Sequence, residues 1–337
     1  MEQRNIIGER KFNLKSFFFQ WEWMLVVVFI AVNIINSSLS PYYLDQGKLM
    51  DATMTFLDKA FIVLPMAFVI ILGDIDISVA STAALSSVVM AVSYNAGMPM
   101  ELAVVLCLLV GTVCGLINGL LIVKFKELSA VIVTLATMII YRGIAYVILE
   151  DQASGKFPDW YSYMGWGYFG GLPFILIAFA VFAVAFGLLL HKTTFGRRLY
   201  AMGNNVTASR FSGIQVDKIK VIVFTLTGLM AGVAALFLTS RMGSTRPNIA
   251  TGYELDVIAM VVLGGISTAG GRGRMIGAVI SIFLIGFLRY GLGLVNIPAQ
   301  VLMIVIGLLL IFAVMVPNLK NNFSSLRKIQ KLKPGAR

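Results

Sequence analysis

The chain has little charge and few of the side chains used most often in catalysis and metal binding. Only 13% of its 337 residues are charged, and it contains one histidine, His191, and two cysteines. One histidine cannot supply the His-Glu-x-x-His pair of a zinc protease. An intramembrane serine protease would require a histidine base beside Ser267, whereas His191 is expected at the end of a different apolar segment. Catalysis is therefore the least favoured function.

The two cysteines do not indicate a disulfide or a metal site. Cys107 and Cys114 lie seven residues apart in one apolar stretch. On a helix this spacing places both on the same face, where they cannot bond to each other. We interpret them as packing residues. The expected site therefore includes no metal, and no cofactor bound by this chain.

Apolar residues dominate what is present. Hydrophobic side chains make up 58% of the chain, which is too many for an ordinary soluble domain. The formal net charge of +11 does not indicate nucleic-acid binding, because the basic residues are spread over two tails and several short loops. The sequence therefore predicts an all-α protein with many membrane spans.

About ten apolar stretches are long enough to be considered as spans. With several residues of uncertainty at each boundary, they cover residues 23–39, 59–73, 77–94, 101–123, 129–149, 172–191, 219–240, 254–268, 275–294 and 298–316. If they alternate in direction, 20 of the 27 Lys and Arg lie at one membrane face and five at the other. Only Arg142 and Arg289 then lie inside a span. Such an excess marks the cytoplasmic face.

The charge distribution also predicts an orientation and a domain organisation. We expect a cytoplasmic N-terminal tail (1–22), one transmembrane domain (23–317) and a basic cytoplasmic C-terminal tail (318–337). The location predicted is the cytoplasmic, or inner, membrane of a prokaryote, with membrane lipid around the spans and no nucleic-acid partner.

A short internal repeat points to transport. Residues 67–76 can be aligned with residues 258–267 at an offset of 191, and Gly73 coincides with Gly264. Each copy ends a span of about fifteen residues, which rises only about 22 Å against a hydrocarbon core of about 30 Å. An odd number of spans separates the copies, from which we predict two inverted halves. Short, glycine-interrupted spans in both halves are typical of a translocation pathway.

The glycine-rich segment 264–273 does not read as a nucleotide site. It lacks the Gly-Lys-Ser/Thr ending that contacts phosphate and magnesium, and it lies at a span boundary. We expect a re-entrant turn there instead. Asp74 and Asp76 likewise do not form an aspartyl dyad, because they are only two residues apart on the same segment.

Two arginines lie within predicted spans. A buried arginine near a helix centre costs about 2.5–3.5 kcal/mol on insertion scales, so it normally faces protein or water. Arg142 and Arg289 either line a polar pathway or have structural roles, such as pairing with a nearby acid or reaching the headgroups. Both alternatives remain open from the sequence.

The cytoplasmic loop 192–218 is predicted to hold a short helix over residues 201–214. Asn204 or Asn205 is suited to cap its start and Gly213 to end it. Such a short helix is not stable alone in water. It therefore needs a partner surface, either another protein or anionic lipid headgroups.

These segments together resemble the ribose-type permease subunits of ATP-binding-cassette importers, which include sugar, autoinducer-2 and rhamnose-like systems. The similarity covers about residues 60–320. It is densest at residues 73–81, 118–119, 134–137, 142–143, 201–214 and 247–277. The family usually has glycine where this chain has Asp74, Ala80 and Ala136, and Asp74 adds a second charge beside Asp76.

The resemblance implies a type II importer permease that performs no chemistry itself. Its implied partners are a cytoplasmic ATPase, which uses ATP, a second permease copy or paralogue, and an extracytoplasmic solute-binding protein. The residues implied to contact the ATPase are Gly203, Asn205, Ala208, Gly213 and Ile214. The translocation pathway is expected near Asp74, Asp76, Asn118, Arg142, Glu254, Ser267 and Arg289.

The main alternative is a secondary transporter driven by an ion gradient, in which Asp74 and Asp76 would bind protons or sodium. Uptake without any ATPase would favour it. The sequence does not identify the solute, and it does not distinguish a permease homodimer from a heterodimer.

Overall fold

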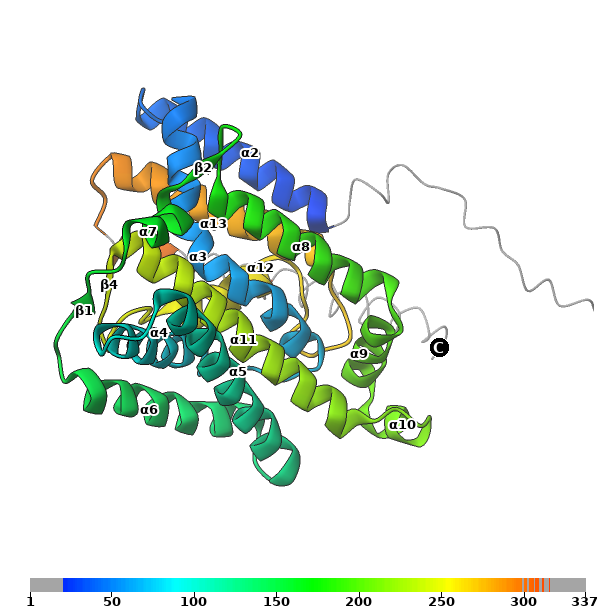
Figure 1. Cartoon of the computed structure of the whole chain (residues 1–337). Helices are drawn as coiled ribbons and strands as arrows, with labels where there is room; N and C mark the ends of the chain where they lie inside the picture. Colours follow the sequence, from blue (N-terminus) through cyan, green and yellow to red (C-terminus); the bar gives the residue numbers. More distant parts are fainter. Residues whose placement is uncertain are drawn as a thin grey trace, which may run out of the picture.

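The computed structural model describes residues 21–298 and, beyond them, residues 300, 301, 303–305, 307, 308, 311 and 315. The helices of this part are α2 (Trp21–Leu39), α3 (Gln46–Ile71), α4 (Val79–Asn95), α5 (Met100–Lys124), α6 (Ala130–Leu149), α7 (Asp159–Trp166), α8 (Phe174–Lys192), α9 (Thr194–Asn204), α10 (Val206–Phe211), α11 (Val216–Met242), α12 (Tyr253–Leu263) and α13 (Met275–Leu294). Figure 1 shows α9 and α10 at one end of the bundle and α7 at the other. We refer to these as the α10 end and the α7 end.

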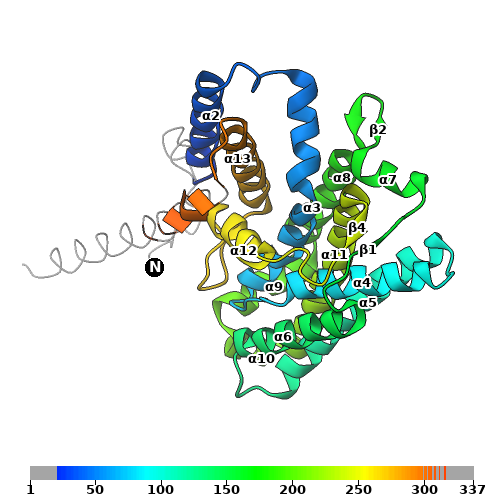
Figure 2. The same cartoon turned by 90° about the vertical axis from the view of Figure 1, so that its left-hand side faces the viewer.

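Four two-residue strands accompany the helices. β1 (Ser154–Gly155) pairs antiparallel with β4 (Ser244–Thr245), and β2 (Tyr168–Phe169) pairs antiparallel with β3 (Leu172–Pro173). All four lie in the connections near α7, as Figure 2 shows from a second side. The architecture is therefore helical, and the strands only fasten loops at the α7 end.

Within the described residues, seven helices are long and apolar enough to cross a membrane, namely α2, α3, α5, α6, α8, α11 and α13. Helix α13 has the predicted bounds. Helix α4 is apolar but has 17 residues, and α12 has only 11. Two of the ten predicted spans are thus shorter than a full crossing, and most of the tenth, 298–316, lies outside the described residues.

Helix α3 is the central helix, and it differs from the prediction at its start. It begins at Gln46 rather than near residue 59, because the Asp45 side chain caps it by accepting a hydrogen bond from the Gly47 N–H at 3.1 Å. With 26 residues it is not a short span, so that part of the repeat prediction is wrong. Lys59, expected at the membrane surface, lies near the middle of α3 and is buried.

Glycines bring α5 and α11 into backbone contact. A Cβ atom added to Gly115 would lie 2.4 Å from the Phe224 carbonyl oxygen, and one added to Gly228 would lie 2.2 Å from the Gly111 carbonyl oxygen. No side chain fits between the helices at these positions, which is typical of small-residue packing in membranes. These glycines therefore allow the close packing of α5 against α11.

The repeat is present in the structure, at an offset of 192 rather than 191. Helices α3 and α12 both end in a turn with a positive-φ glycine, Gly73 at +83° and Gly265 at +84°. The same three backbone hydrogen bonds close each turn, from the N–H groups of Leu72, Gly73 and Asp74 to Phe68, Ile70 and Val69, and from those of Gly264, Gly265 and Ile266 to Met260, Val262 and Val261.

The two copies are parallel, and the prediction that one is inverted is wrong. Lys59 Nζ lies 2.7 Å from Asp256 Oδ2, and further along both segments the Gly271 N–H donates to the Ile71 carbonyl at 2.8 Å. The contacts advance in the same direction along both segments. An odd number of intervening crossings returns the chain to its original direction, so the number of spans was odd as predicted but should have indicated parallel copies.

Candidate functional site

The segment between α8 and α11 folds as two helices instead of one. Helix α9 ends at Asn204 and α10 begins at Val206, with Asn205 between them. Asn205 caps α10, because its Oδ1 accepts a hydrogen bond from the Ala208 N–H at 2.9 Å. Gly213, with φ +80°, follows the end of α10. The predicted cap and terminator are confirmed.

Helix α10 exposes an apolar side chain at the α10 end. Phe211 is 88% exposed, the highest value among the exposed large hydrophobic residues, and Val206 is 39% exposed. Asn205, Ala208 and Gly213 are also exposed, whereas Ile214 is half-buried. Neither Phe211 nor Val206 was among the predicted contact residues. An apolar residue in a short helix outside the predicted spans indicates a contact surface, and this signal could have identified both residues.

Gly203 differs from the other residues implied by the resemblance to contact the ATPase. It lies in the last turn of α9, against the end of α3 and the turn after α12. A Cβ atom there would be 1.9 Å from the Ile71 carbonyl oxygen. The structure therefore places this glycine against the rest of the chain.

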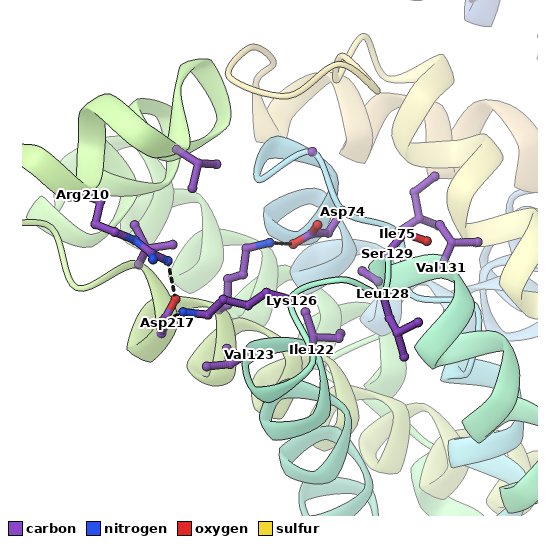
Figure 3. A pocket seen from close by; sticks show the side chains of 15 residues that line it. Asp74, Ile75, Ile122, Val123, Lys126, Leu128, Ser129, Val131, Arg210 and Asp217 are labelled. Carbon is purple, nitrogen blue, oxygen red and sulfur yellow. Dashed lines mark hydrogen bonds and ion pairs between the residues drawn. The ribbon is translucent and has the colours of Figure 1, made fainter.

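A charged cavity of about 390 Å³ lies beside α10 and is drawn in Figure 3. Asp217, at the start of α11, accepts from Arg210 of α10 at 2.7 Å and pairs with Lys126 of the α5–α6 connection at 3.1 Å. On another wall, Lys220 of α11 pairs with Asp74 at 2.6 Å. The ion pairs thus connect α10, α11, the α5–α6 connection and the turn after α3.

Asp76 faces a different environment from Asp74. It is buried and accepts hydrogen bonds from Ser78 N at 2.9 Å and Ser78 Oγ at 2.7 Å. Asn118 of α5 donates to the same Ser78 hydroxyl at 2.7 Å and accepts from the Tyr141 hydroxyl of α6 at 3.1 Å. Asp76 and Asn118 therefore belong to one polar network, from which Asp74 is separate.

The remaining candidates divide between the two ends. Ser267 lies in the turn after α12, where its N–H donates to the Arg272 carbonyl at 3.0 Å. Arg142 lies toward the α7 end and donates to the carbonyls of Pro247 and Ile249, at 2.6 and 2.8 Å. Glu254 follows that loop, and its buried Oε2 has no hydrogen-bond partner among the described residues. The structure therefore brings Asp76 and Asn118 together, but it does not gather all the predicted pathway residues in one place.

A buried charge network joins α3, α11, α12 and α13. Asp256 of α12 binds Lys59 at 2.7 Å and Arg289 at 2.5 Å. Asp58, which is fully buried, binds Arg241 at 2.8 Å and accepts from the Tyr253 hydroxyl at 3.1 Å. Arg289 thus has an acidic partner. Apart from Arg289, sequence reasoning missed these residues, although the capping Asp45 was a signal that α3 starts early enough to include Asp58 and Lys59.

The Asp74–Lys220 ion pair gives a prediction for stability. Both side chains are mostly buried, at 15% and 19% exposed. The Lys220→Ala variant leaves a poorly solvated carboxylate unpaired, and we expect it to lose about 1–3 kcal/mol of stability. Thermal unfolding in detergent measures this loss.

Lys126→Ala is the matched control for that experiment. Its ion pair with Asp217 is 53% and 42% exposed, and Arg210 continues to pair with Asp217. We expect a change below about 1 kcal/mol. Exchanging the charges, as Asp74→Lys with Lys220→Asp, restores the attraction. Equal unfolding temperatures for wild type and Lys220→Ala would show that the pair contributes nothing.

The site contains no arrangement suited to metal chemistry. No group of three or more His, Cys, Asp or Glu side chains in the described residues could hold a metal ion. The seven long apolar helices of the described residues define the class of the chain, a multi-pass membrane protein.

Comparison with known proteins identifies its family. Residues 49–314 match the model of the branched-chain amino acid transport system permease component. The chain is 40% identical over 296 residues to the ribose import permease protein RbsC of Bacillus subtilis, covering 87% of this chain and 91% of that protein. It is 36% identical over 302 residues to the autoinducer 2 import system permease protein LsrD of Klebsiella pneumoniae, covering 88% and 90%.

A third relative agrees with these two. The ribose import permease protein RbsC of Haemophilus influenzae is 36% identical over 304 residues, covering 89% of this chain and 93% of that protein. No solved structure matches the chain. The chain belongs to the branched-chain amino acid transport system permease family, and it is a transport component rather than a catalytic enzyme.

Proposed function

We propose that the chain is the permease subunit of an ATP-driven importer for a sugar-like solute of the ribose or autoinducer-2 type. It would work with a cytoplasmic ATPase, a second permease copy or paralogue, and an extracytoplasmic solute-binding protein. Both termini and the α10 end would face the cytoplasm. The whole-length similarity to ribose and autoinducer 2 import permeases supports the solute class.

The exposed α10 carries the argument for an ATPase partner. A six-residue helix with an almost fully exposed Phe211 is unstable alone and is apolar where water would surround it. Docking into an apolar groove of a partner stabilises the short helix and removes the Phe211 side chain from water. Basic Arg210 and Lys218 beside it fit a groove with an acidic rim. In this proposal Asn205, Ala208 and Gly213 line the contact with Phe211.

The membrane part of the proposal follows the type II importer permeases. It comprises about ten spans within residues 23–317, with cytoplasmic tails at 1–22 and 318–337. Asp76, Asn118 and Ser267 would lie near the inner part of the pathway. Arg142, Glu254 and Arg289 would lie near its outer part, and Asp74 beside the cytoplasmic cavity.

Uptake by the assembled importer tests the function. The chain, its ATPase and its binding protein are reconstituted in vesicles, and entry of labelled D-ribose and of autoinducer 2 is followed with ATP or a non-hydrolysable analogue. We expect uptake only when ATP and the binding protein are both present. Uptake driven by a proton or sodium gradient without the ATPase would contradict the proposal and identify a secondary transporter.

A further inference from the structure

The last turn of α9 touches the ends of both repeat segments. The turn after α12 is bonded to α3 directly, because the Gly271 N–H donates to the Ile71 carbonyl at 2.8 Å. Gly203 lies against this bond. A Cβ atom on Gly203 would be 1.9 Å from the Ile71 oxygen and 2.4 Å from the Gly271 nitrogen. Only a residue without a side chain fits this position.

A second glycine closes the contact from the other side. Gly270 has φ +82°, and a Cβ atom there would be 2.8 Å from the Gly203 oxygen and 3.1 Å from the Gly73 nitrogen. Three chain segments far apart in sequence therefore meet through direct contacts between backbone atoms. Backbone contacts of this kind leave little room for one segment to move without the others.

Side chains of α9 add two hydrogen bonds to the same turn. The Tyr200 hydroxyl donates to the Gly273 carbonyl at 2.7 Å, and Asn204 Nδ2 donates to the Gly271 carbonyl at 3.3 Å. Burial raises the pKa of Tyr200, so its phenol stays protonated and remains a donor at neutral pH. Leu199 and Met202 of the same helix are fully buried. Helix α9 is thus fixed to the turn after α12.

Helix α10 is connected to α9 by a single residue. Asn205 is the only residue between them. Its N–H donates to the Ala201 carbonyl at 3.1 Å, and its side chain caps α10. A displacement of α10 therefore carries the last turn of α9 with it.

We infer that the contact among Gly203, the end of α3 and the 270–271 turn is the joint that transmits a displacement of α10 to α3 and α12. Gly203 is a positioning residue in this joint and does not contact the ATPase. The inference rests on the proposed function, since it takes α10 as the ATPase contact. It adds which residues turn that contact into a movement of the spans.

The Gly203→Ala variant tests the joint in the reconstituted importer. We expect the ATPase to remain bound and to hydrolyse ATP, while solute uptake per ATP falls about tenfold, because the methyl group separates α9 from Ile71 and Gly271. Gly187→Ala in α8 is the matched control. A Cβ atom there meets nothing within 4 Å, so uptake per ATP should equal that of wild type.

The Tyr200→Phe variant keeps the joint testable if Gly203→Ala does not accumulate in the membrane. It removes one hydrogen bond without adding volume, and we expect uptake per ATP to fall about threefold. Tyr42→Phe, in the α2–α3 connection, is its control, because Tyr42 is 64% exposed and its hydroxyl makes no hydrogen bond within the described residues.

The outcomes separate this inference from the proposed function. Wild-type uptake per ATP in Tyr200→Phe, or in a well-expressed Gly203→Ala, overturns the joint while leaving the importer intact. Loss of ATPase binding in Gly203→Ala overturns it as well, because Gly203 would then belong to the docking surface. Absence of ATP-dependent uptake in the wild-type complex contradicts the proposed function itself.

Discussion

Replacing Phe211 with aspartate is expected to weaken binding of the ATPase to the permease by about 30-fold or more. Phe211 is 88% exposed on α10, and an aromatic side chain at the centre of an interface typically contributes 2 kcal/mol or more. Aspartate removes the apolar contact and places a charge in the groove that receives it. Co-purification of the ATPase with the permease measures the loss, and ATP-dependent uptake should disappear with it.

Phe169→Asp is the matched control. It makes the same substitution at a 68% exposed phenylalanine in β2, at the opposite end of the bundle. ATPase binding should therefore be unchanged. Ala208→Arg, which places a bulky charge on the exposed α10, should reproduce the Phe211→Asp result. A full complement of bound ATPase in both α10 variants would rule out docking at this helix.

Replacing Asp58 with alanine is expected to destabilise the protein by about 3–5 kcal/mol, because it leaves the Arg241 charge buried without its partner. Asp58 is fully buried and also accepts the hydrogen bond of the Tyr253 hydroxyl. Thermal unfolding in detergent should show a fall of several degrees in the unfolding temperature. The pair joins α3 to α11, so its loss loosens two long helices at once.

Two further variants separate charge burial from a general effect of substitution. In Asp58→Leu with Arg241→Met, both charges are replaced by apolar groups, and most of the lost stability should return. Lys48→Ala removes an ion pair with Asp45 that is 3.7 Å long and about half exposed, so it should change stability by less than about 1 kcal/mol. If Asp58→Ala unfolds at the same temperature as Lys48→Ala, the buried Asp58–Arg241 pair contributes no more to stability than an exposed ion pair.

Local features were predictable because local chemistry determines them. Helix α13 has the predicted bounds. The Asn205 side chain caps the start of α10, and Gly213, with its positive φ, follows the end of that helix. The start of α3 was missed because hydropathy falls near Asp58 and Lys59, although the helix continues through them. A hydropathy pattern cannot reveal that a charge is neutralised by a distant partner.

The charge network illustrates the same limit. Lys59 and Asp256 are 197 residues apart in sequence, and Asp58 and Arg241 are 183 apart. Only the packing of α3 against α11 and α12 brings these groups together. For that reason Arg289 could be placed within a span, while its partner Asp256 could not be named.

The surroundings of the predicted site residues were also not predictable from the sequence. Asp76 and Asn118 share the Ser78 hydroxyl, a contact between the start of α4 and the last third of α5 that no spacing rule would give. Asp74, only two residues from Asp76, faces the cavity and Lys220 instead. Neighbouring residues outside a helix can point to different surroundings, and the sequence does not specify which.

The shortness of α12 has a consequence for what must cover its exposed side. Eleven residues rise only about 16 Å, about half of a hydrocarbon layer about 30 Å thick, so a membrane crossing at α12 would have to include part of the irregular segment before Tyr253. Irregular backbone is not tolerated against lipid tails. Arg142 satisfies the carbonyls of Pro247 and Ile249 there. On such a crossing, the irregular segment before Tyr253 must therefore border protein or a water-filled lumen rather than acyl chains.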